Sequence, residues 1–267
     1  MSIDVEVAGL RTAPPPVRGL RLSSRQQSLL GVVILLVLLP FALRMEPKNF
    51  AAFLDPGIWR FLAEGVVIVL VISAVAIVLS LPVAVGLALG RLSTRAWLRA
   101  PAIAFVEGIR AIPLLLLIFY VFINMPRDVS VFVGRETLAL TLALLVYTAA
   151  INAETLRAGI LALDRGQMEA ARSLGLSHWA ALRSVILPQA FRNTLPPLLA
   201  QFTTLVKDTS LGLAIGMVEL VSRGRIIYQG ERNPMETLYI VALLYFGVNF
   251  ILEQASLATQ HGGPAPR

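Results

Sequence analysis

Two pairs of opposite charges lie within apolar stretches of this sequence. Glu107 and Arg110 are three residues apart, as are Glu154 and Arg157, so the members of each pair would share one helix face. A charged side chain in hydrocarbon costs about 2.5–3.5 kcal/mol, and it usually pairs with another or lines a polar path. We expect both pairs to gate a path or to pack helices together. The alternative is that their long side chains reach the membrane interface.

A further polar group follows a long apolar run later in the chain. Lys207 and Asp208 end this run, and two hydroxyl residues come next before apolar residues resume. Such side chains at a helix break offer donors and acceptors to a zwitterionic solute. We expect Asp208, Thr209 and Ser210 to line a solute pathway, and helix capping is the alternative role. Glu154 is another candidate for this pathway.

Several other kinds of reactive site are missing from the sequence. It contains no cysteine, which excludes a disulfide framework and a cysteine metal site. Its two histidines, His178 and His261, are far apart, so we expect no metal site. Its two lysines follow Pro47 and Val206, which excludes the Gly-Lys-Ser/Thr loop that holds nucleotide phosphates. We therefore expect no enzymatic activity and no cofactor bound by this chain.

The composition is that of a membrane protein. Of 267 residues, 57% are hydrophobic and 15% are charged, whereas soluble domains have about 45–50% apolar and about 25% charged residues. Six apolar stretches come close to or exceed the length of about 20 residues that a helix needs to cross a bilayer. They are residues 29–43, 61–89, 102–123, 138–158, 195–217 and 238–252. The sequence thus predicts an all-α integral membrane protein, built as a six-helix bundle.

The two ends of the chain differ from this apolar centre. Residues 1–28 hold four arginines and three consecutive prolines without a sustained apolar period, which predicts a flexible tail. Residues 29–43 have a basic flank but no small-residue cleavage site, which favours an uncleaved extra helix before the main transmembrane domain at 61–252. Residues 253–267 are expected to form a second flexible tail. A modest excess of arginine in alternate loops predicts that both termini are cytoplasmic.

Between the fourth and fifth predicted spans, the sequence indicates two short helices joined by a tight turn. Asp164, followed three residues later by Gln167, resembles a capping box at the start of the first helix. Gly175 is the residue type best able to adopt the left-handed conformation after a helix end. Ser177 is placed to cap the second helix, which Pro188 would stop or kink. The predicted orientation makes this hairpin cytoplasmic.

A DNA-binding helix-turn-helix also joins two helices by a short turn, and the spacing of Ala171 and Gly175 fits that pattern. The second helix does not fit it. Ala181 occupies the position where a bulky aliphatic residue should lock the two helices together. The exposed face would present His178 and Trp179 rather than a row of base-reading side chains. We therefore expect no nucleic-acid binding.

Four segments of the sequence carry motifs of a known kind. They are IRAIPLLLLIFY at 109–120, AETLRAGILALDRGQMEAA at 153–171, EAARSLGLSHWAALRSVILP at 169–188 and KDTSLGLAIGMVEL at 207–220. Together they resemble the permease subunits of ATP-binding cassette (ABC) importers with the type I fold, over about residues 61–252, and the last segment is similar to the branch for polar amino acids. The third segment is similar to the cytoplasmic EAA loop of that family, which would occupy about residues 160–192 here.

The resemblance implies a role for the hairpin. In the family, a short coupling helix of the EAA loop docks in a groove of a cytoplasmic ATPase subunit. Small alanines would allow such a partner to approach closely, and a glycine would set the angle between the two helices. Packing of the hairpin against its own bundle is the alternative. The residues to which the resemblance assigns ATPase coupling are Glu169, Ala170, Ala171, Gly175, Leu176 and Ser177.

The resemblance also implies a function and partners. The chain would form half of the translocation pathway of an amino acid importer in the bacterial cytoplasmic (inner) membrane. Its partners would be membrane lipid, a second permease subunit, identical or different, ATPase subunits that bind ATP and Mg²⁺, and an extracytoplasmic solute-binding protein. Two alternatives remain open. An ion-coupled secondary transporter would carry its own buried titratable group, and a membrane regulator would bind a partner without transporting solute.

Overall fold

The computed structural model describes residues 44–128 and 134–261, and every regular element within these ranges is helical. The all-α prediction is therefore confirmed for the described part of the chain. The predicted tail at 1–28 and the predicted extra helix at 29–43 lie outside the described residues. In chain order the elements are η1 (Pro47–Leu54), α2 (Pro56–Leu92), α3 (Ala96–Ala111), α4 (Leu114–Asn124), α5 (Arg135–Leu161), α6 (Arg165–Ser173), α7 (His178–Ala181), η2 (Leu182–Ile186), α8 (Leu187–Asp208), η3 (Thr209–Ile215), α9 (Leu220–Glu231) and α10 (Pro234–His261).

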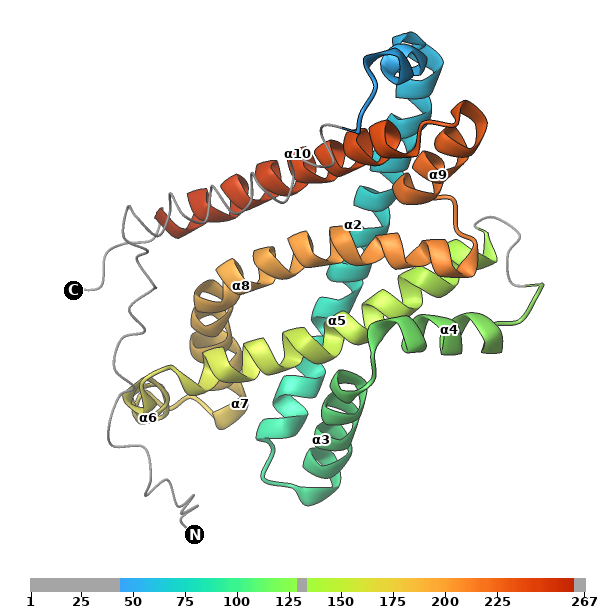
Figure 1. The fold of residues 1–267 in the computed structure, drawn as a ribbon. Helices are drawn as coiled ribbons and strands as arrows, with labels where there is room; N and C mark the ends of the chain where they lie inside the picture. The colour runs from blue at the N-terminus through green and yellow to red at the C-terminus, as the bar shows by residue number, and fades with distance from the viewer. Residues whose placement is uncertain (1–43, 129–133, 262–267) are drawn as a thin grey trace. The chain divides into compact units, whose positions relative to one another are not determined.

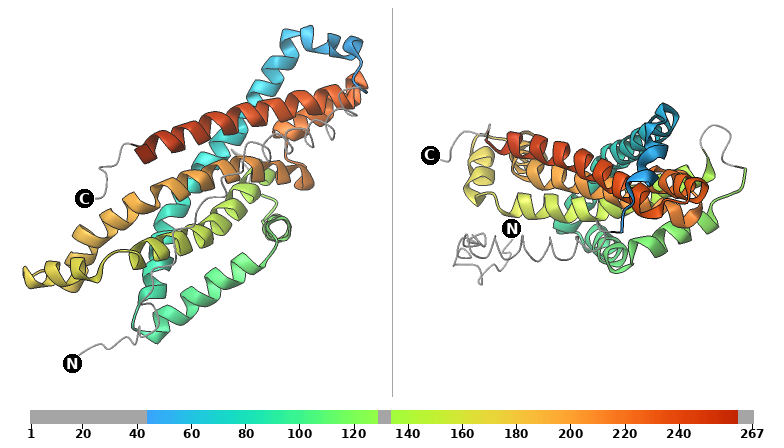
Figure 2. Two further views of the ribbon diagram at one scale, coloured as in Figure 1. Left: turned by 60° about the vertical axis from the view of Figure 1, so that its left-hand side comes forward. Right: turned by 45° about the horizontal axis from the view of Figure 1, so that its top comes forward.

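The longest of these helices is α2, with 37 residues. It begins where the side chain of Asp55 accepts a hydrogen bond from the Gly57 N–H over 2.8 Å. At 1.5 Å per residue it is about 55 Å long, longer than a hydrocarbon core of about 30 Å. Figures 1 and 2 show α8 between α10 and α5, with α2 crossing α5 and α8. The two ends of α2 therefore reach different regions of the protein.

The predicted span at 102–123 is not one continuous helix. It is divided into α3 and α4, whose axes differ in direction by 106°. Ile112, which precedes Pro113, has extended backbone angles of φ −84° and ψ 130°. A proline ring disfavours the α conformation of the preceding residue, which explains why the helix ends there. The two arms pack on α5, and they form either one broken span or a re-entrant segment.

Five of the six predicted spans fall within the described residues, and fewer than five helices there are long and apolar enough to cross a membrane. Within the described ranges, α2, α5 and the part of α10 from Pro234 to Ala255 are long and apolar enough, and the bent pair α3–α4 makes a fourth span if counted as one. The predicted span at 195–217 falls on α8 and η3, which are not among these segments. α10 continues as a helix to His261, so the residues from 253 to 261 are helical, not a flexible tail.

Small buried residues bring the long helices together. Ala84 and Ala88 of α2 cluster with Ala153 and Leu156 of α5 and with Leu198 of α8. Packing of this kind stabilises membrane helices, because lipid is as apolar as the side chains and gives no hydrophobic drive for association. This cluster lies next to the end of α2 that leads into α3. It supports the charged side chains described below.

Candidate functional site

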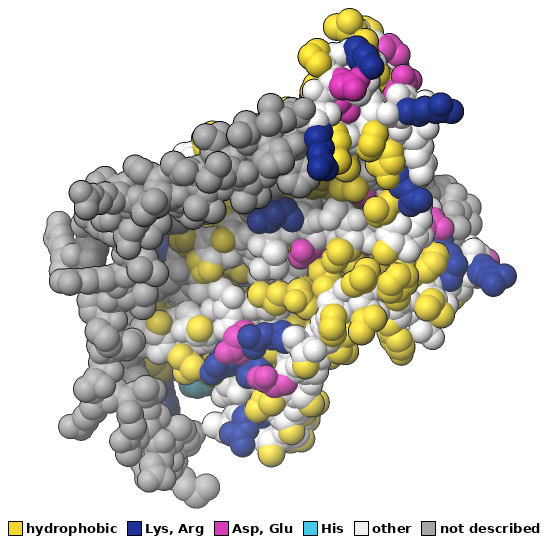
Figure 3. Space-filling model, viewed as in Figure 1, with side chains coloured by type: hydrophobic (Ala, Val, Ile, Leu, Met, Phe, Trp, Pro, Cys, Tyr) yellow, Lys and Arg dark blue, Asp and Glu magenta, His cyan; other side chains and the backbone are white. Residues whose placement is uncertain are grey.

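Charged side chains gather in two regions on the face shown in Figure 3. One region lies beside α3, and the other lies beside η1 and α9, with apolar side chains over α4 between them. These regions lie at the two ends of α2, since η1 precedes this helix and α3 follows it. The hairpin of α6 and α7 forms a third region, between α5 and α8 in the chain. Each region is described below from its residues.

The first helix of the hairpin begins and ends as predicted. The side chain of Asp164 accepts a hydrogen bond from the Gly166 N–H over 2.8 Å. At the other end, Gly175 has a φ of +86°, and its N–H donates to the carbonyl of Arg172 over 3.0 Å. The N–H of Leu176 donates to the carbonyl of Ala171 over 3.3 Å. These two bonds form a Schellman motif, which satisfies carbonyls that the helix leaves free.

The second half of the hairpin differs from the prediction. Ser177 caps α7 as expected, since its hydroxyl accepts from the Ala180 N–H over 3.2 Å. Helical structure does not end at Pro188, however. It continues from α7 through the π-helical turn η2 into α8, which contains Pro188 near its start. Proline has no N–H, and its ring clashes with the carbonyl four residues earlier, so a wider turn accommodates it. Of the two bonds of the predicted capping box, only the one to Asp164 forms. The side chain of Gln167 accepts a hydrogen bond from the Gln189 side chain over 3.5 Å instead of from the start of the helix.

Most of the predicted coupling residues are accessible. Ala171 is the exception, because it is only 4% exposed and contributes to packing. Two large apolar side chains of the hairpin are also exposed, although they were not among the predicted coupling residues. Leu174 is 84% exposed and Trp179 is 60% exposed. Large exposed apolar side chains are typical of surfaces that bind other proteins. Of the remaining predicted residues, Leu176 is half-buried, and Glu169, Ala170, Gly175 and Ser177 are exposed.

One of the two predicted ion pairs forms and the other does not. Arg157 makes a bidentate pair with Glu154, with bonds of 3.0 Å from Nε and 2.5 Å from Nη2. Glu107 does not pair with Arg110, its predicted partner. It accepts instead from Nη2 of Arg91 over 2.8 Å, and Nη1 of Arg91 lies 3.3 Å from Glu154. Arg91 was not singled out in the sequence, since nothing local distinguishes it from other arginines.

The polar residues at the end of α8 are of two kinds, hydroxyl residues and charged residues, and their contacts differ. The hydroxyl of buried Thr209 donates to the Val206 carbonyl over 2.7 Å, and that of Ser210 donates to the Lys207 carbonyl over 2.7 Å. Both hydroxyls thus bond to backbone carbonyls three residues earlier, and the side chain of Asp208, at the start of η3, makes no capping hydrogen bond. Within the described part of the chain, the charged groups of Lys207 and Asp208 make no hydrogen bond or ion pair. Lys207 is exposed and Asp208 is half-buried.

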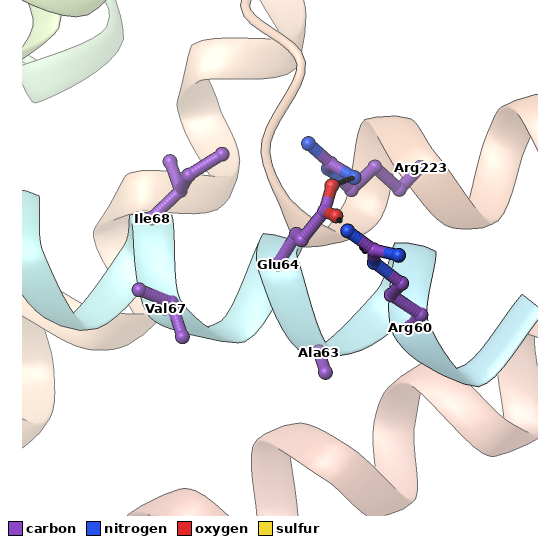
Figure 4. Close-up of a pocket in the computed structure, with 6 residues that line it drawn as sticks. All are labelled: Arg60, Ala63, Glu64, Val67, Ile68 and Arg223. Carbon is purple, nitrogen blue, oxygen red and sulfur yellow. Dashed lines mark hydrogen bonds and ion pairs between the residues drawn. The ribbon is translucent and has the colours of Figure 1, made fainter. Parts of the chain in front are cut away.

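A pocket of about 560 Å³ lies at the other end of α2. Figure 4 shows the carboxylate of Glu64 between the guanidinium groups of Arg60 and Arg223. Arg223 of α9 donates to Glu64 over 3.0 Å and to the Phe61 carbonyl over 2.8 Å, and its guanidinium carbon lies 4.3 Å from the centre of the Phe61 ring. Arg60 is a weaker partner, at 3.5 Å from Glu64. Arg223 therefore fastens α9 to α2.

Glu219 starts α9 and lies outside the membrane-length helices. Its carboxylate is fully buried, and it accepts from the N–H groups of Val221 and Ser222 over 2.8 Å each. It also accepts from the Ser222 hydroxyl over 3.0 Å and from the Tyr245 hydroxyl of α10 over 3.2 Å. Burial raises the pKa of Glu219, although these hydrogen bonds act in the opposite direction. Glu219 thus links the start of α9 to α10.

None of these regions resembles a metal centre. Within residues 44–128 and 134–261, no group of three or more His, Asp or Glu side chains could hold a metal ion. The ion pairs among the described residues lie within one helix, as for Arg157 and Glu154, or join two helices, as for Arg91 and Glu154 or Arg223 and Glu64. The geometry is that of a helical membrane protein with a protruding hairpin.

The sequence of this chain is similar to those of known proteins. The model of the family described as "Binding-protein-dependent transport system inner membrane component" matches residues 80–256. The "Probable glutamine ABC transporter permease protein GlnP" of Bacillus subtilis is 35% identical over 205 residues, which are 73% of this chain and 90% of that protein. The "Glutamate transport system permease protein GluD" of Corynebacterium glutamicum is 32% identical over 78% of this chain and 74% of its own length.

The fold is similar to that of a solved transporter. The structure described as an amino acid ABC transporter with histidines has a TM-score of 0.68 and 29% identity, and the match covers 76% of this chain and 94% of that one. The match therefore includes nearly all of the solved chain. The family match includes the hairpin and all the helices from the end of α2 into α10. The chain is therefore a transport subunit that belongs to the family of inner membrane components of binding-protein-dependent transport systems.

Proposed function

We propose that this chain forms half of the translocation pathway for amino acids in an ABC importer. The hairpin carries this proposal: two short helices between α5 and α8 carry Leu174 and Trp179, whose side chains remain largely exposed within the described part of the chain. The names of the relatives, which are amino acid permeases, support the class of solute. Glutamine and glutamate are the solutes in those names, so a small polar amino acid is the first candidate.

ATPase docking is the role that we assign to the hairpin. Glu169 and Ala170 lie on its exposed side, and Gly175 holds the turn in a conformation that other residue types adopt at a cost. Ala171 would support this surface from beneath, and Leu176 and Ser177 would position α7. ATP and Mg²⁺ would bind to the separate ATPase subunits, since this chain has no phosphate-binding loop.

The solute would meet Lys207 and Asp208. A zwitterionic amino acid carries one ammonium and one carboxylate group, and these two side chains offer the opposite charges, with no competing ion pair among residues 44–128 and 134–261. Thr209 and Ser210 would shape the backbone around this pair through their bonds to α8. Glu154 is already held by Arg157 and Arg91, so its contribution to the pathway would be through helix packing.

The complete importer would contain several chains in the bacterial cytoplasmic membrane. A second permease subunit, the same or different, would supply the other half of the pathway, and a solute-binding protein would deliver the amino acid from outside. The hairpin and both termini would lie on the cytoplasmic side. The ATPase subunits would contact the hairpin there and move it when they bind and hydrolyse ATP. The permease subunits would then alternate between outward-open and inward-open states.

Uptake of labelled amino acids by cells that express the importer tests this proposal. Uptake should stop when the ATPase subunit is inactivated and should persist when an uncoupler dissipates the proton gradient while ATP is maintained. Uptake that survives loss of the ATPase but stops with the uncoupler would identify an ion-coupled transporter instead. Vesicles that contain the complete complex and take up no solute would favour a regulator.

A further inference from the structure

Arg91 joins three helices at the end of α2 that leads into α3. Its side chain is only 10% exposed. One guanidinium nitrogen donates to Glu107 of α3 over 2.8 Å, and another lies 3.3 Å from Glu154 of α5. Among the described ion pairs, this is the one arginine that pairs with carboxylates on two other helices. Arg91 therefore links α2 to α3 and α5 through one planar group.

The helices are closely packed beside this arginine. A β-carbon on Gly90 would lie 3.0 Å from the β-carbon of Ala102, so α2 and α3 approach closely next to Arg91. A buried cluster that includes Ala88, Val106 and Ala153 joins α2, α3 and α5 beneath the charged groups. The apolar cluster holds the helices near one another. The charged groups add a directional hydrogen bond from Arg91 to Glu107 and a charge–charge attraction between Arg91 and Glu154, and both favour one placement of the helices.

Movement of the hairpin would reach Arg91 and its carboxylate partners through α5. Glu154 lies two turns before the end of α5 at Leu161, and α6 begins a few residues later at Arg165. The bidentate bond with Arg157 holds the Glu154 carboxylate in a defined orientation. Arg157 cannot take over the role of Arg91, because its bonds to Glu154 lie within α5 and reach no other helix.

We propose that Arg91 is the positioning residue that makes α2 and α3 follow the hairpin during transport. Its two carboxylate partners place α3 and α5 in a fixed arrangement, so displacement of α6 and α7 moves these helices as one body. The proposal rests on the proposed function, because it assumes that an ATPase displaces the hairpin. It assigns no contact between Arg91 and the solute or the nucleotide.

The activity test uses the complete importer in lipid vesicles, with Arg91→Gln as the variant. Arg91→Gln removes the positive charge, and its shorter side chain cannot reach the two carboxylates that the guanidinium group contacts. We expect the ratio of ATPase activity with loaded binding protein to basal activity to fall by about fivefold or more. Arg91→Lys should recover part of this ratio. Arg99→Gln is the matched control, since Arg99 is exposed on α3 and has no ion pair with any residue that the structure describes, and it should leave the ratio unchanged.

A second variant keeps the proposal testable if Arg91→Gln does not fold. Glu107 is 57% exposed, so Glu107→Gln is expected to fold normally while it weakens the bond to α3. It should lower the same ratio by a smaller factor. A ratio unchanged in both Arg91→Gln and Glu107→Gln would overturn the proposal. A wild-type importer without ATPase-dependent uptake would instead contradict the proposed function.

A distance measurement tests the positioning role without any transport. The chain has no cysteine, so spin labels can be attached at Leu98→Cys on α3 and Ser173→Cys on α6. In the assembled complex, the distribution of label distances should be narrow and should broaden when Arg91→Gln is added. Arg99→Gln should leave the distribution narrow. An equally narrow distribution with and without Arg91 would refute the proposal, whatever solute the importer carries.

Discussion

Gly159 of α5 and Thr194 of α8 lie so close together that a β-carbon on Gly159 would be 2.2 Å from the methyl group of Thr194. The hydroxyl of Thr194 donates to the carbonyl of Ala190 over 2.9 Å, which holds the side chain in this orientation. Because α5 and α8 are the two helices that flank the hairpin, this contact fixes the distance between its two attachment points.

Gly159→Ala should therefore destabilise the protein by about 1–3 kcal/mol, because the added methyl group overpacks the contact. Thermal unfolding in detergent measures the change. Thr194→Ser removes the opposing methyl group and keeps the hydroxyl, so the double variant should recover most of the lost stability. Gly86→Ala is the control, since a β-carbon on Gly86 meets no atom within 4 Å. Absence of recovery in the double variant would contradict the assigned contact.

Gly175→Asp should uncouple transport from ATP hydrolysis. The φ of +86° at Gly175 costs a residue with a side chain about 1–2 kcal/mol, although a β-carbon there meets no neighbouring atom. The strain should tilt α7 against α6 and disrupt the ATPase contact, while the permease still reaches the membrane. Gly175→Asn should be milder, because asparagine tolerates the left-handed conformation. Uptake and stimulated ATPase activity at the wild-type level in Gly175→Asp would count against the docking role.

Leu174→Ala and Trp179→Ala should each lower the affinity for the ATPase subunit by about tenfold, because exposed large side chains carry most of the binding energy in protein interfaces. Binding of purified ATPase to the permease in detergent gives the affinity. The melting temperature of the permease should not change, since both side chains are mostly exposed. Trp97→Ala, at a residue of similar exposure on α3, should leave ATPase binding unaffected.

Arg223 and Arg60 share the carboxylate of Glu64, but we expect their substitutions to differ in effect. Arg223→Gln should lower the free energy of unfolding by about 1–2 kcal/mol, after allowance for the half-exposed Glu64 partner. Its bonds to the Phe61 carbonyl and ring would be lost as well. Arg60 is 85% exposed, and Arg60→Gln should change stability by less than about 0.5 kcal/mol. Denaturation of the two variants in parallel would show whether Arg223 is the residue that holds α9.

The buried carboxylate of Glu219 predicts a dependence of stability on pH. Burial raises its pKa in the folded state above the ordinary glutamate value, so the folded state binds more protons than the unfolded state between these two values. The contribution to stability is thus greatest below the ordinary pKa and is lost as the pH rises through the raised pKa. The melting temperature of the wild type should fall across this window relative to Glu219→Gln, which cannot ionise. Parallel curves for the two proteins would show that Glu219 does not titrate there.

Much of the hairpin could be predicted from local residue types. Asp164, Gly175 and Ser177 form their bonds to groups within about five residues along the chain. Such bonds depend on backbone conformation, which neighbouring residues determine. The long apolar runs likewise indicated membrane helices, because a bilayer demands a certain length of apolar chain. These features needed no knowledge of which helices are neighbours.

The bend between α3 and α4 was not predictable in the same way. Pro113 ends a helix, yet Pro82 and Pro101 lie inside α2 and α3 without ending them. Membrane helices tolerate proline where neighbouring groups satisfy the freed backbone. Whether a proline ends a helix therefore depends on surrounding packing, and the 106° bend is a property of the tertiary structure.

The sequence by itself determined the helical membrane class, the hairpin with its glycine turn, and the residue types available for charge. Only the tertiary structure decided which charges pair: Glu107 with Arg91 rather than Arg110, and Lys207 and Asp208 with no side chain among the residues that the structure describes. The physical reason is the separation along the sequence of the groups that interact. A cap or a turn is complete within one or two helical turns, whereas an ion pair between helices depends on how segments distant in sequence pack against one another.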